Sequence, residues 1–379
     1  MKIVTVVGAR PQFIKAAPVS LKLRESGITE IFVHTGQHYN PRMSGNFFRE
    51  LNLPPPNYNL GVGSATHGKQ TGRMLEALEA IMLREEPDWV LVYGDTNSTL
   101  AGALAAAKLH IPIAHVEAGI RSYNPVMPEE INRRLTDHVS TALLCPTEQA
   151  VRNLEQEGFN NILNGGKLTD IAPPVRLKTG TTPLVVNVGD VMYDMVLKTG
   201  RRLESMSPQI LKRYQVSKDK YVLATVHRSE NTDHKARLEG VIEGLSRLGV
   251  TVILPLHPRT KKYLSDYALF PRINQAKNIV LTEPLGYVEL LSLLKNARCV
   301  VTDSGGIQKE AYLLGVPCLT CRNETEWPET VDSGWNRLVG LGGAELLQSF
   351  PFRLLQDKRP QWFGDGSAAQ RIVQLLRNY

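Results

Sequence analysis

Ionisable side chains gather in the first half of the chain, at points where short apolar segments end. Three of them are carboxylates, Asp95, Glu117 and Glu129, and cations stand at similar positions: Arg10, Lys15, Arg121 and Arg133. Burial and neighbouring charges tune such groups, and a mixed set of this kind suits proton abstraction at carbon and the stabilisation of developing negative charge.

These residues also have structural interpretations. Asp95 stands where a cap of the following helix is expected, and Glu129 and Glu130 follow Pro128 in a predicted first helical turn, where acidic residues are favoured electrostatically. Lys15 could be a solvated helix residue. The functional interpretation is favoured because such residues recur at successive strand ends. His115, by contrast, fits a histidine satisfied inside a strand better than it fits a ligand.

The segment 301–317 is typical of a buried strand, a glycine turn and a helix that begins directly after the turn. Ser304, Gly305 and Gly306 would leave backbone N–H groups unhindered at that helix N-terminus, where the helix dipole favours an anion. Glu310 follows about one helical turn later, within reach of a sugar hydroxyl. The pattern predicts a nucleotide phosphate site, with an ordinary serine-capped turn as the alternative.

Three further polar segments follow predicted strands in the second half of the chain. They contain His227, His257 and Tyr287. A nucleotide needs N–H donors for its phosphates, a carboxylate for its ribose and an apolar or aromatic wall for its base. These segments, together with the Ser304 turn, are expected to line one side of a nucleotide site.

Alternating strand-length and helix-length segments must position these residues. The predicted strands of the first half are Lys2–Val7, Ile31–Thr35, Trp89–Tyr93, Ile113–Val116, Ala142–Cys145 and Leu184–Val188. Those of the second half are Tyr221–Val226, Val250–Pro255, Asn278–Leu281, Ala297–Thr302 and Val316–Thr320. The alternation predicts an α/β protein with parallel sheets, in which ligands bind beyond the carboxyl ends of strands. A length of 379 residues favours two Rossmann-like lobes, 1–188 and 189–358.

Composition excludes several functional classes. The net charge is +7, but no dense basic segment indicates nucleic acid, and an anionic small substrate fits better. No apolar run of about 18 residues predicts a membrane span, and the first residues lack the features of a signal peptide, so a cytoplasmic protein is expected. The pair Cys318 and Cys321 lacks the partners of a zinc site. His34 and His38 fall in a strand and a loop, so no metal or redox cofactor is expected.

Several motifs, in order along nearly the whole chain, resemble one family. They are 8–15 (GARPQFIK), 36–38 (GQH), 94–99 (GDTNST), 115–119 (HVEAG), 128–133 (PEEINR), 303–306 (DSGG) and 325–329 (TEWPE). The sequence is similar to the non-hydrolysing UDP-N-acetylglucosamine 2-epimerases and their relatives that act on UDP-2,3-diacetamido-glucuronate. The resemblance implies a glycosyltransferase-B-like fold, with two lobes facing a cleft, a C-terminal helix (359–379) returning to the first lobe, and a homodimer.

The implied reaction inverts C2 of the sugar. UDP is eliminated to give a 2-acetamidoglycal and is then added back, with no cofactor or metal. By motif, Asp95, Glu117 and Glu129 would be the acid–base carboxylates, in an order that the sequence leaves open, and His227 would lie near the diphosphate. Arg10, Lys15 and Arg133 would be further site residues. The UDP cradle would comprise Ser304, Gly305, Gly306 and Glu310.

The sequence also departs from better-known members of the family. Residues 39–44 differ from the glutamine-containing pattern of members that their own substrate activates, so substrate activation stays open. Trp327 stands where many members have arginine, and 334–338 resembles the diacetamido-uronate branch. A uronate substrate would need an additional cation for its carboxylate, which Arg121 or Arg322 could supply.

Two functions outside the epimerases also stay open. They are a UDP-sugar glycosyltransferase of the same fold, which would share the nucleotide cradle, and a non-catalytic nucleotide-sugar sensor. The set Asp95, Glu117, Glu129 and His227 favours an epimerase over both. The loop 160–183 is assigned no function.

Overall fold

The computed structural model describes residues 1–37, 48–170, 182–343, 345–352, 354 and 358–378. These form two compact units, Met1–Leu197 with Gln361–Tyr379, and Lys198–Pro360. The unit boundary falls inside helix α7 (Val191–Arg213), later than the predicted limit at residue 188, because this helix is continuous across it. His38, the divergent stretch 39–44 and residues 171–181 of the loop 160–183 lie outside the described residues.

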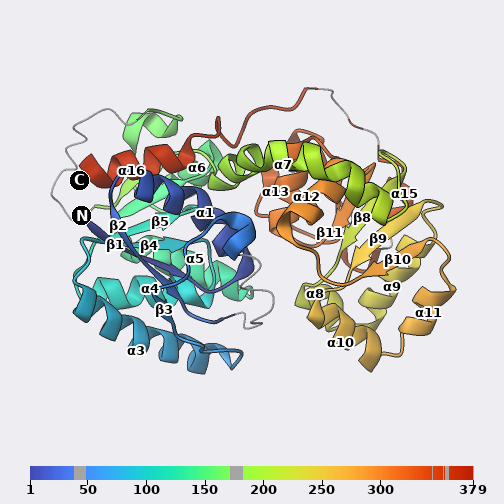
Figure 1. The fold of residues 1–379 in the computed structure, drawn as a ribbon, viewed down its shortest axis with the longest axis horizontal. Helices are drawn as coiled ribbons and strands as arrows, with labels where there is room; N and C mark the ends of the chain where they lie inside the picture. The colour runs from blue at the N-terminus through green and yellow to red at the C-terminus, as the bar shows by residue number, and fades with distance from the viewer. Residues whose placement is uncertain (38–47, 171–181, 344, 353, 355–357, 379) are drawn as a thin grey trace. The chain divides into compact units, whose positions relative to one another are not determined.

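The first unit contains a seven-stranded parallel sheet, in the order β3-β2-β1-β4-β5-β6-β7 (Figure 1). Its strands are β1 (Lys2–Val7), β2 (Thr29–His34), β3 (Tyr58–Asn59), β4 (Trp89–Tyr93), β5 (Ile113–Val116), β6 (Ala142–Cys145) and β7 (Leu184–Asn187). The predicted strands of this half are confirmed with small shifts at their ends. β3 was not predicted, because two residues carry no periodic signal.

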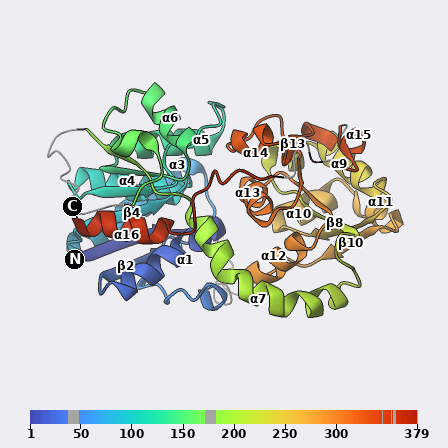
Figure 2. The same cartoon turned by 90° about the horizontal axis from the view of Figure 1, so that it is seen from above.

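Helices cover both faces of this sheet. They are α1 (Arg10–Glu25), α3 (His67–Glu85), α4 (Asn97–Lys108), α5 (Pro128–Val139), α6 (Glu148–Gln156) and α16 (Ala368–Asn378). α3, α4 and α5 pack side by side, and α16 packs against α1 (Figures 1 and 2). α4 approaches the sheet closely because Gly102 has no side chain, and a Cβ there would lie 3.2 Å from methyl groups of Val6 and Val92.

The second unit contains a six-stranded parallel sheet, in the order β10-β9-β8-β11-β12-β13. Its strands are β8 (Tyr221–Thr225), β9 (Thr251–Pro255), β10 (Ile279–Thr282), β11 (Cys299–Thr302), β12 (Cys318–Thr320) and β13 (Asn336–Leu338). The helices that follow them include α8 (Ser229–Thr232), α9 (Lys235–Ser246), α10 (Pro258–Asp266), α11 (Phe270–Gln275), α12 (Tyr287–Lys295), α13 (Gly305–Leu314), α14 (Pro328–Asp332) and α15 (Leu346–Ser349). The two parallel sheets confirm the predicted fold class.

Each sheet has a point where the strand order reverses, between β1 and β4 in the first unit and between β8 and β11 in the second. Helices connected to the two central strands leave in opposite directions there, which opens a crevice at the carboxyl ends of those strands. The predicted functional segments after β1, β4, β8 and β11 all lie at these two points. None of the helices in the described part of the chain has the length and apolar character needed to span a bilayer.

Candidate active site

The turns after β1 and β4 are held together by the side chain of Gln12. Its Oε1 accepts hydrogen bonds from the backbone N–H groups of Gly8 (2.8 Å) and Ala9 (3.0 Å). Its Nε2 donates to the carbonyl oxygen of Tyr93 (2.9 Å) and to Thr99 Oγ1 (3.0 Å). Gln12 is buried, so its polar atoms are all used inside the protein, and the start of α1 is fixed against the end of β4.

Glu117 is a buried carboxylate in the turn after β5, paired with a lysine from α1. Lys15 Nζ lies 2.5 Å from Glu117 Oε1, and the exposed fractions of the two side chains are 10% and 8%. Lys15 is therefore not a solvated helix residue. The backbone of Glu117 has φ +69°, an uncommon value for a residue with a side chain, and such strain is concentrated at functional sites.

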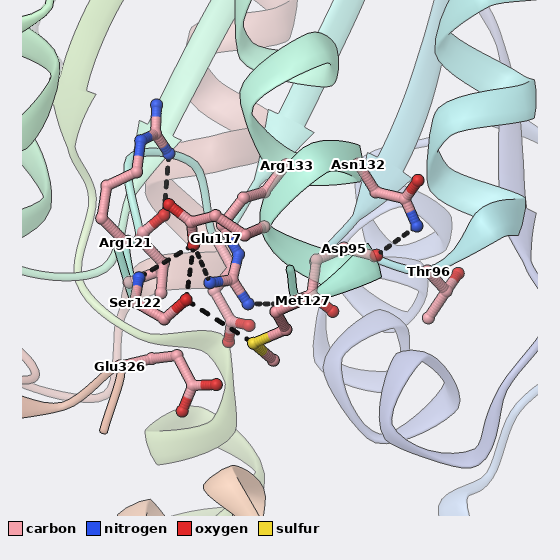
Figure 3. Close-up of polar contacts among 12 residues, drawn as sticks. Asp95, Thr96, Glu117, Arg121, Ser122, Met127, Asn132, Arg133 and Glu326 are labelled. Atoms are coloured by element: carbon pink, nitrogen blue, oxygen red, sulfur yellow. Dashed lines mark hydrogen bonds and ion pairs between the residues drawn. The ribbon is translucent and has the colours of Figure 1, made fainter. Parts of the chain in front are cut away.

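Asp95, in the turn after β4, is held at two points by α5 (Figure 3). Its carboxylate accepts a hydrogen bond from Arg133 NH2, and its carbonyl oxygen accepts one from Asn132 Nδ2 at 2.9 Å. Thr96 occupies the N-cap position of α4 and accepts from the backbone N–H of Thr99. Asp95 is consequently not the helix cap, and its side chain stays 28% exposed.

Of the two adjacent glutamates in the first turn of α5, the second has a fixed position. Glu130 is buried, and its Oε2 accepts hydrogen bonds from Arg133 NH1 (2.7 Å), the backbone N–H of Ser122 (2.8 Å) and Ser122 Oγ (2.9 Å). Arg133 therefore bridges Glu130 and Asp95. Glu129 is half-buried beside it in the same turn, and Arg10 is half-buried at the start of α1.

In the second unit, the carboxylate of Asp303 joins the turns after β8 and β11. It is fully buried and accepts hydrogen bonds at 3.0 Å from the backbone N–H groups of His227 and Arg228. Asn231 Nδ2 donates to the same carboxylate at 3.1 Å. The backbone that carries His227 is thus fixed to the residue that precedes Ser304.

In the glycine turn after β11, one of the three backbone N–H groups predicted to bind a phosphate has a partner inside the protein. The backbone N–H of Ser304 donates to Thr302 Oγ1 at 3.0 Å, so it is not available to a phosphate. α13 begins at Gly305, and the first N–H groups of a helix have no acceptor within it. The predicted anion donors are therefore Gly305, Gly306 and the next residue, with Ser304 contributing only its hydroxyl. Ser304 makes no side-chain cap of α13.

Buried charges surround the start of α13. Arg322 binds Glu326 through NH1 (2.6 Å) and NH2 (3.1 Å), and Arg228 NH2 lies 3.4 Å from the same carboxylate. A Cβ placed on Gly305 would lie 3.4 Å from Glu326 Oε2. Glu310 is 2% exposed and lies on the buried side of α13.

Two predicted binding residues of the second unit lie next to each other. The ring centroids of His227 and His257 are 5.0 Å apart. His257 is the N-cap of α10, and its Nδ1 accepts from the backbone N–H of Arg259 at 3.2 Å. Tyr287 is fully buried in α12, and its ring therefore belongs to the core and is not an open wall for a base.

Arg121 does not supply the additional cation suggested for a uronate. NH1 lies 2.8 Å from Asp137, and Nε and NH2 donate to Glu157 at 2.8 and 2.7 Å. Burial alone would lower the pKa of Arg121, but the hydrogen bonds and charges of these carboxylates raise it on balance. The guanidinium group of Arg121 is thus bound by two carboxylates of the first unit. The guanidinium of Arg322 is likewise held by Glu326.

The cysteines and histidines form no recognisable metal centre in the described ranges. Cys318 and Cys321 are buried, and burial raises the pKa of the Cys318 thiol to about 12. His115 is hydrogen-bonded through both ring nitrogens, which confirms its interpretation as a satisfied strand histidine.

Sequence reasoning missed the residues that position the site, namely Gln12, Asn132, Asp137, Asp303 and Glu326. Four of them, Gln12, Asn132, Asp303 and Glu326, lie inside the motifs quoted above, which was a usable signal. Asp137 lies 20 residues beyond Glu117 in sequence, in the last turns of α5, and nothing in its neighbourhood indicates its partners.

The chain is similar to proteins of one kind over its full length. A model of the UDP-N-acetylglucosamine 2-epimerase family matches residues 21–377. A UDP-N-acetylglucosamine 2-epimerase homolog of Methanococcus maripaludis is 51% identical, with 100% of both chains covered. The UDP-2,3-diacetamido-2,3-dideoxy-D-glucuronate 2-epimerase of Pseudomonas aeruginosa is 46% identical over 99% of both. The crystal structure of Methanocaldococcus jannaschii UDP-GlcNAc 2-epimerase, in complex with UDP-GlcNAc and UDP, superimposes with a TM-score of 0.88 at 42% identity over 100% of both chains.

Proposed function

The chain belongs to the UDP-N-acetylglucosamine 2-epimerase family, and we propose that it interconverts UDP-N-acetylglucosamine and UDP-N-acetylmannosamine. It is an isomerase acting on a UDP-sugar. The observation that carries the proposal is the pair of charged residues Asp95 and Glu117 on neighbouring strand ends, each bound to its own cation. A glycosyltransferase has no need for two such carboxylates beside its sugar site.

Proton transfer is assigned to the first unit. During elimination the C2–H and C1–O bonds break, a C1=C2 double bond forms, and UDP departs with the bonding electron pair. Re-addition of UDP to C1, with protonation of C2 on the opposite face, completes the inversion. Asp95, Glu117 and Glu129 are the groups that exchange these protons, and Lys15 and Arg133 fix two of them through ion pairs.

Retention of UDP is assigned to the second unit. Negative charge grows on the diphosphate as the C1–O bond breaks, so donors fixed in advance stabilise the transition state more than the bound substrate. The N–H groups of Gly305 and Gly306 at the start of α13 are such donors, and His227 and His257 add ring donors. Glu310 is assigned to the ribose hydroxyls.

The diacetamido-glucuronate is the second candidate substrate, because the Pseudomonas aeruginosa relative is 46% identical. A uronate substrate would need a cation for its carboxylate. The two arginines considered for that role, Arg121 and Arg322, are both bound to carboxylates of the protein, which argues against this substrate. A homodimer and a cytoplasmic location stay predictions.

The deciding experiment follows the C2 proton by NMR in deuterated water. Purified protein is incubated separately with UDP-N-acetylglucosamine and with the diacetamido-uronate. We expect inversion at C2 with incorporation of one deuterium from solvent for the N-acetyl substrate. Inversion of the uronate alone would reassign the substrate, and absence of exchange with both sugars would refute the proposed activity.

A further inference from the structure

The turns that carry Asp95 and Glu117 are connected by a buried chain of hydrogen bonds that the reaction itself does not use. His115, on β5, lies at the centre of this chain. Its Nε2 lies 2.7 Å from the carbonyl oxygen of Gly94, the residue before Asp95. Its Nδ1 lies 2.7 Å from Asp137 Oδ1. Both ring nitrogens thus lie within hydrogen-bond distance of an oxygen atom, one from each partner.

Asp137 continues the chain to the other turn. Its Oδ2 accepts from the backbone N–H of Gly119 at 3.2 Å, two residues after Glu117, and lies 2.8 Å from Arg121 NH1. The side chains of His115, Asp137 and Arg121 are all 0% exposed. Burial on its own would raise the pKa of Asp137, but the neighbouring His115 and Arg121 lower it on balance. The lowered pKa favours the ionised form of Asp137, in which both carboxylate oxygens accept hydrogen bonds.

The turn after β5 needs such support because its backbone is strained. Glu117 has φ +69°, a conformation that costs roughly 1–3 kcal/mol and persists only where the surroundings impose it. The N–H groups of Glu117 and Ala118 both point to the carbonyl oxygen of Leu144, at 3.1 and 3.3 Å, and Asn153 Nδ2 binds the carbonyl oxygen of Gly119 at 2.9 Å. Asp137 adds a further fixed contact to this turn.

We infer that Asp137 and His115 are positioning residues for the epimerase reaction, which together set the relative placement of the Asp95 and Glu117 carboxylates. This inference rests on the proposed function. Neither side chain is accessible to substrate, so both act through the backbone of the two turns. A displacement of about 1 Å in a reacting group can cost about 100-fold in rate. A polar partner behind a reacting group therefore affects turnover more than it affects binding.

The test compares isosteric variants in steady-state epimerisation, with UDP affinity and thermal stability measured in parallel. Asp137→Asn keeps the shape but places an amide NH₂ group where one carboxylate oxygen faces its donors, which are His115 on one oxygen and Gly119 and Arg121 on the other. We expect its kcat to fall roughly 10- to 100-fold, with KM and the UDP dissociation constant within about twofold of the wild type. Glu30→Gln is the control, because Glu30 is a half-buried carboxylate of the same sheet bound to Thr5 and Ser20, away from both turns. It should leave kcat unchanged.

A second pair of variants keeps the inference testable if Asp137→Asn does not fold. His115→Gln places an amide donor close to the original Nε2 and can still bind the Gly94 carbonyl, whereas His115→Asn is too short to reach it. His115→Gln should therefore keep more of the wild-type kcat than His115→Asn. Equal kcat in these two variants, or a wild-type kcat in Asp137→Asn, overturns the positioning role. A wild-type enzyme that inverts neither sugar refutes the proposed function instead.

Discussion

Gly306 provides a substitution in which binding and stability should change in opposite directions. It is the second residue of α13, its φ lies outside the left-handed region, and a Cβ there would meet only Ser304 Oγ, at 3.9 Å. The protein therefore has room for Gly306→Ala. Alanine in place of a helical glycine stabilises by up to about 1 kcal/mol, so we expect Tm to stay constant or to rise by a few degrees.

The same methyl group would stand where the phosphate is proposed to approach the N–H groups of α13. Loss of one hydrogen bond to a charged group costs about 1.5–3 kcal/mol, which corresponds to roughly a 10- to 150-fold weaker UDP complex. Isothermal titration calorimetry with UDP measures this change, and differential scanning calorimetry measures Tm. Gly72→Ala in α3 is the control, because a Cβ there meets nothing within 4 Å, and it should leave UDP affinity unchanged. Unchanged UDP affinity in Gly306→Ala would refute the phosphate assignment.

Three further predictions concern the first unit. Glu117→Gln should retain UDP affinity within about threefold while kcat falls at least about 100-fold, measured by calorimetry and NMR turnover; parallel loss of both would make Glu117 structural. Gly8→Ala should lower the free energy of unfolding by about 1–3 kcal/mol in urea titrations, because its Cβ would overlap the hydroxyl of Ser98. Burial, with neighbouring carboxylates, raises the pKa of Asp194 to about 6, so its contribution to stability is present below about pH 4 and is lost as pH rises through 6. The stability of the wild type relative to Asp194→Asn should thus rise by roughly 3 kcal/mol from pH 8 to pH 4, and a pH-independent difference contradicts this.

Much of the fold could be predicted because parallel strands buried on both faces are continuous apolar runs. β1, β4, β5 and β6 have the predicted limits for this reason. β3 and β13 span two and three residues, too few for any periodicity, and they pair only because the neighbouring strands offer open edges. The start of α4 was also harder to predict from the sequence, because its N-cap is Thr96 and not Asp95.

The candidate site was predictable in its residue types but not in its pairings. Strand ends show where Lys15 and Glu117 lie, but their ion pair joins residues 102 positions apart. Arg121 illustrates the opposite error, because an arginine after a strand suggests an open cation, while its partners Asp137 and Glu157 come from distant segments of the chain. Side-chain pairing depends on the packing of whole elements, and a single sequence contains no direct record of it.

In each sheet, one buried side chain holds together the two turns at the point where the strand order reverses. Two turns must be held at a fixed spacing there, although the strands that precede them lead to helices in opposite directions. In the first unit Gln12 accepts from the turn after β1 and donates to the end of β4, as an amide can. In the second unit Asp303 lies after β11 and accepts only from N–H groups, two of them at His227 and Arg228 after β8, which requires a carboxylate. The side-chain type at each switch point therefore follows from the groups that face it. Gln12 faces both donors and acceptors and is an amide, whereas Asp303 faces donors alone and is a carboxylate.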